Sequence, residues 1–293
     1  MSTDPARPDW LDTGLYPFEA HWFDAPDGRM HYVDEGSGSP VVMLHGNPTW
    51  SFQYRNVIPA LVSGGRRAIA PDQLGFGLSD KPSGYSYRPV DQARQFAAFM
   101  DALDLRDVTL VVGDWGGPVG LSWALDHPER MKSLVITNTW LWSVRSDWYY
   151  QGFSRFMGGP VGRWLILNKN FFAGDFLRRV YGDKSRLTPE IHAHYLEPLG
   201  SPQEREGSAV FPREIVGSSD WLASLWERRA AIAGTRATLA WGMKDLAFRE
   251  KELDRWRALF REARVVKYGD CGHFVAEERP DDLTREILEA SAG

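Results

Sequence analysis

The sequence has one cysteine, no long apolar run and no cluster of basic residues, and each shortage excludes a class of protein. The single cysteine, Cys271, rules out an intrachain disulfide and a thiolate metal cluster, and we interpret it as a buried bystander thiol. No apolar run approaches the roughly 20 residues that span a bilayer. Residues 1–5 lack the charged and apolar regions of a secretory leader. These absences predict a soluble, cytoplasmic protein.

The charge balance argues against two classes of binding partner, nucleic acids and anionic membranes. The formal net charge is -5, and no run of Lys or Arg is present. Nucleic acids and anionic membranes attract basic surfaces, so neither is an expected partner. With 293 residues, of which 43% are hydrophobic, the chain can bury a sizeable core as one large α/β domain or two smaller ones.

Short β-branched runs alternate with helical patterns along most of the chain, which is typical of an α/β protein with a mostly parallel sheet. The first two strands flank an Asp27-Gly28 turn and form a hairpin. Strands are predicted at residues 20–25, 29–34, 41–44, 67–70, 108–112, 133–137, 238–241 and 264–268. Helices are predicted at residues 90–103, 118–126, 251–260 and 280–290, among others.

The alternation fails between residues 140 and 217, where aromatic residues crowd together. We interpret residues 141–217 as a helical cap inserted into a core formed by residues 1–140 and 218–293. A cap at this point of the chain would lie over the carboxyl edge of the sheet, where ligands of open α/β sheets bind. The alternative is that the aromatic side chains form only the core of a second small domain. They are Trp142, Trp148, Tyr149, Tyr150, Phe153, Phe156, Trp164, Phe171, Phe172 and Phe176.

A carboxylate follows the predicted strand 108–112, at a turn where many hydrolases carry a serine. Residues 112–117 read VGDWGG, so Asp114 is flanked by glycines that allow the tight bend of a nucleophile turn. Val112 departs from the small residue usual two positions earlier. A carboxylate can displace a leaving group from saturated carbon and form an ester that water then opens. The alternative is that Asp114 is only a helix N-cap.

An aspartate and a histidine follow two other predicted strands, which gives the chain order nucleophile, acid, histidine. His273 lies in the loop after the last predicted strand, and Asp245 follows the strand before it. A histidine there can activate water if a carboxylate fixes its tautomer. The strand ending at residue 137 is followed by Asn138 and no carboxylate, so Asp245 is the favoured acid. Read alone, His273 could be a surface residue and Asp245 a turn former.

Asn47 and Trp115 form the predicted opposite wall of the site. Asn47 follows the strand 41–44, and Trp115 follows Asp114 directly. Their backbone N–H groups are the expected oxyanion hole for ester hydrolysis, and their side-chain N–H groups can hold a departing halide. The alternatives are that Asn47 is a turn residue before Pro48 and that Trp115 is a packing residue.

Five segments resemble the haloalkane dehalogenases of the α/β-hydrolase fold, and the resemblance spans roughly residues 17–290. They are residues 45–50 (HGNPTW), 72–79 (DQLGFGLS), 113–117 (GDWGG), 241–245 (WGMKD) and 272–274 (GHF). An Asn-Trp halide pair with an acid after the seventh strand is similar to the third dehalogenase subfamily.

The resemblance implies an eight-stranded, mostly parallel sheet with helices on both faces and an inserted cap. It implies that Asp114 attacks, that Asn47 and Trp115 bind halide, that His273 activates water and that Asp245 supports it. A small halogenated hydrophobic substrate is expected, with no metal or organic cofactor. The subfamily also forms oligomers, and the 13 tryptophans of this chain make a homo-oligomer the expected state.

Three other functions remain open at this stage. The β-lactone decarboxylases of bacterial olefin biosynthesis resemble the same subfamily and share its Asp-His-Asp arrangement. Epoxide hydrolases also use an Asp-Trp pair but protonate the departing oxygen with cap tyrosines, here Tyr149, Tyr150, Tyr181 or Tyr195. A binding protein without turnover is the third alternative, although such proteins often lack a member of the triad.

Overall fold

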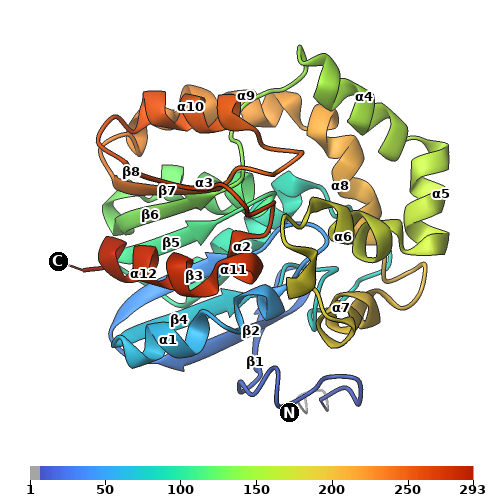
Figure 1. Cartoon of the computed structure of the whole chain (residues 1–293), viewed down its shortest axis with the longest axis horizontal. Helices are drawn as coiled ribbons and strands as arrows, with labels where there is room; N and C mark the ends of the chain where they lie inside the picture. Colours follow the sequence, from blue (N-terminus) through green and yellow to red (C-terminus); the bar gives the residue numbers. More distant parts are fainter. Residues whose placement is uncertain (1–6, 293) are drawn as a thin grey trace.

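The structure is a computed structural model that describes residues 7–292. Residues 1–5, from which the absence of a leader was argued, lie outside the described residues. An eight-stranded sheet in the order β1-β2-β4-β3-β5-β6-β7-β8 forms the centre of the molecule (Figure 1). Its strands are β1 (His21–Ala25), β2 (Gly28–Gly36), β3 (Ser39–Leu44), β4 (Arg66–Pro71), β5 (Val108–Val112), β6 (Met131–Thr137), β7 (Arg236–Gly242) and β8 (Arg264–Tyr268).

The sheet is mostly parallel, as predicted. Strand β2 pairs antiparallel with β1 and β4, and the remaining neighbours pair parallel. Every predicted strand is present, with ends within two residues of the prediction. The α/β-hydrolase architecture with a mostly parallel, eight-stranded sheet is therefore confirmed.

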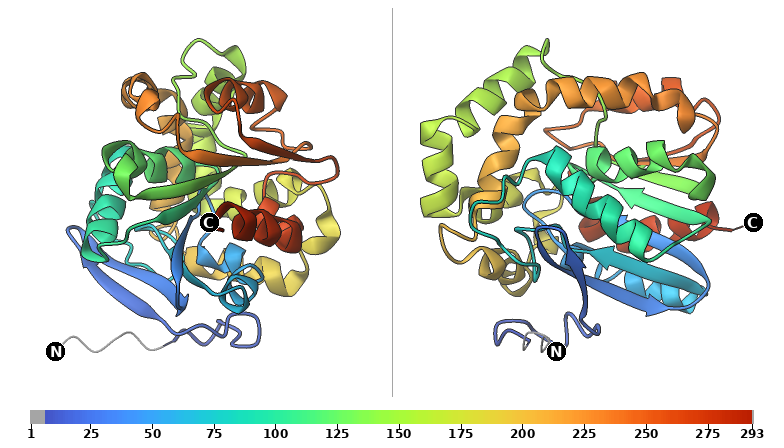
Figure 2. Two further views of the ribbon diagram at one scale, coloured as in Figure 1. Left: turned by 90° about the vertical axis from the view of Figure 1, so that its left-hand side faces the viewer. Right: turned by 180° about the vertical axis from the view of Figure 1, so that it is seen from behind.

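Helices cover both faces of the sheet, which explains why its central strands β3, β5 and β6 are mostly apolar and mostly buried. Figure 2 shows the two helical layers edge-on. Successive residues of β3 point to opposite faces, so Val41 and Met43 join one hydrophobic core and Val42 and Leu44 join the other. The covering helices are α1 (Ile58–Ser63), α2 (Pro89–Ala102), α3 (Gly116–Asp126), α9 (Ser219–Glu227), α10 (Glu250–Leu259), α11 (Val275–Glu278) and α12 (Pro280–Ala290).

The chain between β6 and α9 folds into helices that gather beyond one end of the sheet (Figure 1). We call residues 141–217 the cap segment. Its helices are α4 (Trp148–Met157), α5 (Pro160–Lys169), a π-helical turn (Phe172–Phe176), α6 (Leu177–Val180), α7 (Pro189–Leu196) and α8 (Glu206–Gly217). None of the helices among the described residues is long and apolar enough to cross a membrane.

The aromatic residues of the cap segment have three different environments. Trp142 packs into the main core against Trp226 and Trp256. Phe172 belongs to a small core of the cap segment itself, together with Met157 and neighbouring side chains. Phe171 packs against this small core, and Phe172 also lines a cavity, described below, with Tyr149, Tyr150, Phe153 and Phe176. The other three are exposed to solvent. Exposed fractions reach 81% for Trp148, 59% for Phe156 and 50% for Trp164.

Candidate active site

Asp114 lies at a strained turn between β5 and α3. Its φ is +46°, in the left-handed region that residues with a Cβ rarely adopt, and such strain is typical of functional positions. The turn is tightly packed, because a Cβ at Gly116 would lie 2.3 Å from the carbonyl oxygen of Leu44. Val112 is accommodated by Gly120, where a Cβ would lie 2.9 Å from Val112 Cγ1.

The carboxylate of Asp114 does not cap helix α3. Its Oδ1 accepts the backbone N–H of Asn47 at 2.8 Å, and α3 has no side-chain capping bond. The other oxygen, Oδ2, lies 3.5 Å from Nε2 of His273. One oxygen is thus held by a donor from the loop after β3, and the other faces the histidine.

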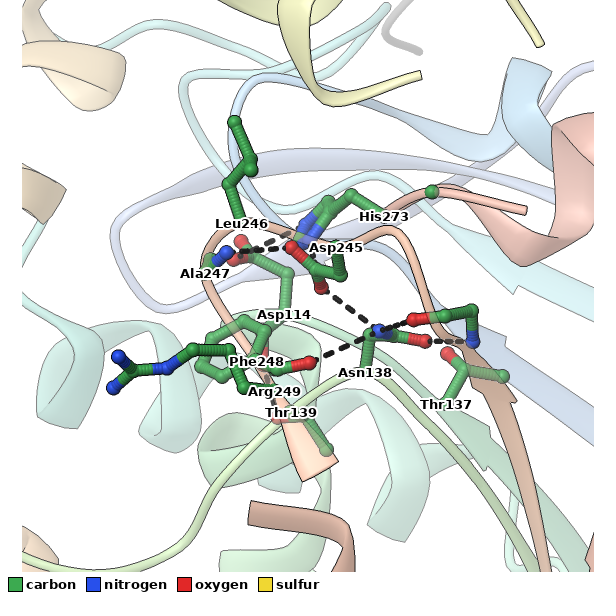
Figure 3. A network of polar contacts seen from close by, with 12 residues as sticks. Asp114, Thr137, Asn138, Thr139, Asp245, Leu246, Ala247, Phe248, Arg249 and His273 are labelled. Atoms are coloured by element: carbon green, nitrogen blue, oxygen red, sulfur yellow. Dashed lines mark hydrogen bonds and ion pairs between the residues drawn. The ribbon is translucent and has the colours of Figure 1, made fainter. Parts of the chain in front are cut away.

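His273 is held by contacts on three sides. Its Nδ1 donates to Oδ2 of Asp245 at 2.8 Å, as Figure 3 shows. Its backbone N–H donates to the carbonyl oxygen of Val180 in the cap segment at 2.9 Å. The imidazole stacks on Phe248, with ring centroids 5.7 Å apart. These contacts fix the ring so that Nε2 is directed at Asp114.

Asp245 is buried and accepts three hydrogen bonds. Besides His273, its donors are Nδ2 of Asn138 at 2.8 Å and the backbone N–H of Ala247 at 2.7 Å (Figure 3). Asn138 also binds both backbone groups of Gly242, which ties the ends of β6 and β7 together. From the sequence alone, Asn138 was evident only as the residue that stands where a carboxylate is absent, and its support of Asp245 was not predicted. Its place after a strand end, beside the other site residues, was the available signal.

The two carboxylates change the proton affinity of His273. Burial by itself would lower its pKa, but the charges and hydrogen bonds of Asp245 and Asp114 outweigh burial and raise that pKa to about 10. At neutral pH the imidazole is therefore protonated while Asp114 is an unmodified carboxylate. Cys271 has the opposite character, because burial raises the pKa of its thiol and leaves it unreactive.

A mostly apolar cavity of about 180 Å³ opens above Asp114. Asn47 and Trp115 line it, and their side-chain N–H groups donate to no acceptor among residues 7–292. The cap segment supplies much of the cavity wall. Some of its aromatic residues therefore line a pocket, whereas others form only a core of the cap segment. Its lining residues include Tyr149, Tyr150, Phe153, Phe172, Phe176 and Val180.

The hydroxyl groups of the two cavity tyrosines are already engaged. Tyr149 donates to the carbonyl oxygen of Leu246 at 2.7 Å, and Tyr150 donates to that of Ala247 at 2.8 Å. Tyr181 and Tyr195 are absent from the described lining of this cavity. Among the described residues that line the cavity, no tyrosine hydroxyl is therefore free to protonate a leaving oxygen beside Asp114.

The sequence matches the family described as alpha/beta hydrolase fold over residues 39–280. This chain belongs to the α/β-hydrolase family. Among curated relatives, haloalkane dehalogenase 2 of Mycobacterium tuberculosis is 40% identical over 280 residues, covering 95% of this chain and 96% of the relative. A cis-3-alkyl-4-alkyloxetan-2-one decarboxylase of Shewanella oneidensis is 34% identical over 298 residues, covering 94% of this chain and 89% of the relative.

Solved structures of other α/β hydrolases superpose over nearly the whole chain. The haloalkane dehalogenase DbeA from Bradyrhizobium elkani has a TM-score of 0.85 at 27% identity, covering 94% of this hydrolase and 98% of that chain. The haloalkane dehalogenase DatA from Agrobacterium tumefaciens has a TM-score of 0.82 at 27% identity, covering 96% and 100%. The five site residues expected from the sequence lie around one cavity or, for Asp245, directly behind it.

Proposed function

We propose that this chain is a hydrolase acting on carbon–halide bonds, which converts small haloalkanes to an alcohol and a halide ion through an ester on Asp114. One observation carries the proposal. A carboxylate, not a hydroxyl, occupies the strained nucleophile turn, with one oxygen held by the N–H of Asn47 and the other 3.5 Å from His273. Its 40% identity to a haloalkane dehalogenase supports the same reaction.

In the first step, Oδ2 of Asp114 attacks the halogen-bearing carbon in line. The carbon–halogen bond breaks, and its electron pair leaves with the halide. The side-chain N–H groups of Asn47 and Trp115, which have no acceptor among residues 7–292, stabilise the ion. An alkyl ester of Asp114 remains.

In the second step, His273 removes a proton from water, and the resulting hydroxide attacks the carboxyl carbon of the ester. The backbone N–H of Asn47, already 2.8 Å from Oδ1, stabilises the oxyanion together with that of Trp115. The alcohol departs and Asp114 is restored. The proton taken from water stays on His273, which returns to its initial protonated state, and the halide is released to solvent.

Esterification itself prepares His273 for this second step. In the free enzyme, the pKa of His273 is about 10, partly because Asp114 is a charged acceptor beside it. The ester has no charge, so that contribution is lost and the pKa falls. His273 then releases its proton and becomes a base only after the nucleophile has reacted.

A second, smaller cavity supports the placement of the hydrolytic water. It measures about 20 Å³ and is lined by Asp114, His273 and Thr137, among others. That volume suits a single water molecule, since about one probe sphere of free space is needed. A water there would lie beside both the base and the carboxyl group that it attacks.

The cap segment, residues 141–217, has the proposed role of a cap domain on a core of residues 1–140 and 218–293. It would exclude bulk water from the cavity and set the size of substrate. The exposed Trp148, Phe156 and Trp164 on α4 and α5 support the prediction of a homo-oligomer, because such aromatic surface is commonly buried between subunits.

A β-lactone decarboxylase is the second candidate, because a relative of that name is 34% identical and the site contains the same Asp-His-Asp arrangement. Epoxide hydrolysis is less favoured, since Tyr149 and Tyr150 donate their hydroxyl groups to backbone carbonyls. The leaving oxygen of an epoxide needs such an acid, whereas a halide does not.

The test is halide release from 1,2-dibromoethane and 1-iodobutane at neutral pH by wild type, Asp114→Asn and Asp175→Asn. Asp175 is an exposed carboxylate of the cap segment and serves as the matched control. Halide release that is lost only in Asp114→Asn supports the proposal. No release by wild type, with alkene and carbon dioxide formed from a cis-3,4-dialkyl oxetan-2-one, would replace it with the decarboxylase.

A further inference from the structure

Helix α11, which begins two residues after His273, carries a buried carboxylate that the proposed reaction does not use. This residue, Glu278, is only 2% exposed. Its Oε1 accepts the backbone N–H of Gly272 at 2.9 Å, and its Oε2 accepts that of Asp183 at 2.8 Å. Gly272 directly precedes His273, whereas Asp183 belongs to the cap segment. One side chain therefore joins the loop of the proposed base to the cap segment.

Backbone N–H groups, and no cation, balance the charge of this carboxylate. Glu278 makes no ion pair among the described residues 7–292. Burial raises the pKa of Glu278 above its ordinary value, although the N–H groups of Asp183, Gly182 and Gly272 act in the opposite direction. A buried charge without a counterion is costly, so packing alone does not explain an ionisable side chain at this position.

Backbone contacts bring the same two segments together beside Glu278. The backbone N–H of His273 donates to the carbonyl oxygen of Val180 at 2.9 Å. A Cβ at Gly272 would lie 2.5 Å from the nitrogen of Gly182, and a Cβ at Gly182 would lie 2.6 Å from the nitrogen of Gly272. Two successive N–H groups of the loop are thus bound, one directly by the cap segment and the other through Glu278.

Helix α11 is itself fixed to both the core and the cap segment. The carboxylate of Glu277 accepts two hydrogen bonds from the guanidinium of Arg55, of which the one from Nη2 measures 2.9 Å. It also accepts the hydroxyl of Tyr195 in α7. Arg55 and Tyr195 are both buried. The helix that carries Glu278 is therefore a firm support for the loop of the base.

We propose that Glu278 is a positioning residue, which fixes the backbone of His273 against the cap segment so that ester hydrolysis, but not ester formation, depends on it. This inference rests on the proposed function. A base displaced by about 1 Å from its water can lose roughly 10² in rate. Asp114 performs the first step and is held separately by Asn47. Val180 lines the cavity, so the same link ties the base to the wall around the substrate.

The experiment replaces Glu278 with glutamine, which has nearly the same size but only one acceptor oxygen. In either orientation the NH₂ group of Glu278→Gln meets a backbone N–H, so the bridge is lost. Rapid-quench kinetics with 1-iodobutane measures the iodide burst and the turnover that follows. We expect ester hydrolysis per active site to slow by about ten- to a hundredfold, with the burst rate close to that of wild type. Glu262→Gln, at an exposed glutamate, is the control and should match wild type.

The turnover rate divided by the burst amplitude separates positioning from folding. If Glu278 only stabilised the fold, Glu278→Gln would contain fewer active sites, each of which would hydrolyse the ester at the wild-type rate. That result would overturn the inference, as would a burst that slows as much as turnover does. A wild type that gives no iodide burst contradicts only the proposed function, and the titration described next then decides the inference.

An NMR titration of wild type tests the link without turnover and covers a Glu278→Gln variant that does not fold. Protonation of Glu278 converts one of its acceptor oxygens into a donor. The amide signals of Gly272 and Asp183 should therefore shift with the same midpoint as the carboxyl carbon of Glu278. The imidazole signals of His273 should follow. Because the pKa of His273 is about 10, its ring stays protonated in the acid range and the shift reports a displacement.

The other titratable groups that face Glu278 can be told apart from it. Burial raises the pKa of the Tyr181 hydroxyl and of the Cys271 thiol, so both stay neutral on acidification. Hydrogen bonds from a neighbouring serine lower the pKa of Asp183, which moves its titration away from that of Glu278. The carboxyl carbon of Glu277 gives a separate signal. Amide signals of the two segments, or imidazole signals of the base, that do not follow Glu278 would overturn the inference.

Discussion

Replacing Asp245 with asparagine tests how the base is supported. Every partner of this carboxylate is a donor, namely Nδ1 of His273, Nδ2 of Asn138 and the backbone N–H of Ala247. A carboxylate satisfies all three, because both of its oxygens accept. An amide has one oxygen and an NH₂ group, so in either orientation it directs a donor at a donor.

The structure gives the expected size of the effect. The Asp245 side chain is 0% exposed, so water cannot relieve the conflict, and we expect the free energy of unfolding to fall by about 1–3 kcal/mol. The pKa of His273 should also fall, because Asp245 contributes both a charge and a hydrogen bond that raise it. Hydrolysis should slow by roughly 10²- to 10⁴-fold, since general base catalysis by His273 depends on this orientation. Alkylation should slow much less, because Asp114 performs it.

Rapid-quench kinetics with 1-iodobutane measures both steps. We expect Asp245→Asn to release about one equivalent of iodide per chain in a burst and then to turn over slowly, with the alkyl adduct visible in the intact mass. Asp254→Asn, an exposed carboxylate paired with Arg257, is the control and should behave as wild type. A steady-state rate within threefold of wild type, or a burst that slows as much as turnover, would refute the reasoning.

Three further predictions concern the same loops. The pKa of His273 is about 10 before esterification and lower afterwards, so mixing with 1-iodobutane at pH 8 should release a proton together with the iodide burst. The absorbance of a pH indicator in weak buffer, followed by stopped flow, measures this release. Proton release that lags behind iodide release would contradict the prediction. Asn138→Leu leaves Asp245 one donor short and the backbone N–H of Gly242 in β7 unpaired. We expect the free energy of unfolding, measured in urea, to fall by about 2–4 kcal/mol, and kcat to fall about tenfold with KM nearly unchanged. An unaltered kcat would show that Asn138 does not support the base. In Gly272→Ala the new Cβ would lie 2.1 Å from the carbonyl oxygen of Val180 in the cap segment, so kcat should fall while the halide Kd stays unchanged. A fall in kcat with an equal loss of halide affinity would indicate general unfolding.

Local information was enough to determine the framework of this protein. The five residues of β5 are all buried, four of them are apolar, and a glycine follows, so a strand followed by a turn could be predicted without any knowledge of its partners. The same holds for α12, whose apolar positions recur at helical spacing and whose bounds, Pro280–Ala290, match the prediction. The placement of Asp114, Asp245 and His273 after three different strands followed from this framework, because parallel strands bring their carboxyl ends to one edge.

Tertiary structure alone decided what each of these groups is paired with. Asn138 supports a carboxylate 107 residues away, and no local pattern marks that pairing. The raised pKa of His273 results from two carboxylates brought by other loops. Strands and turns depend on interactions between near neighbours in sequence, whereas charge, burial and hydrogen-bond competition depend on which distant groups share the same few ångströms of space.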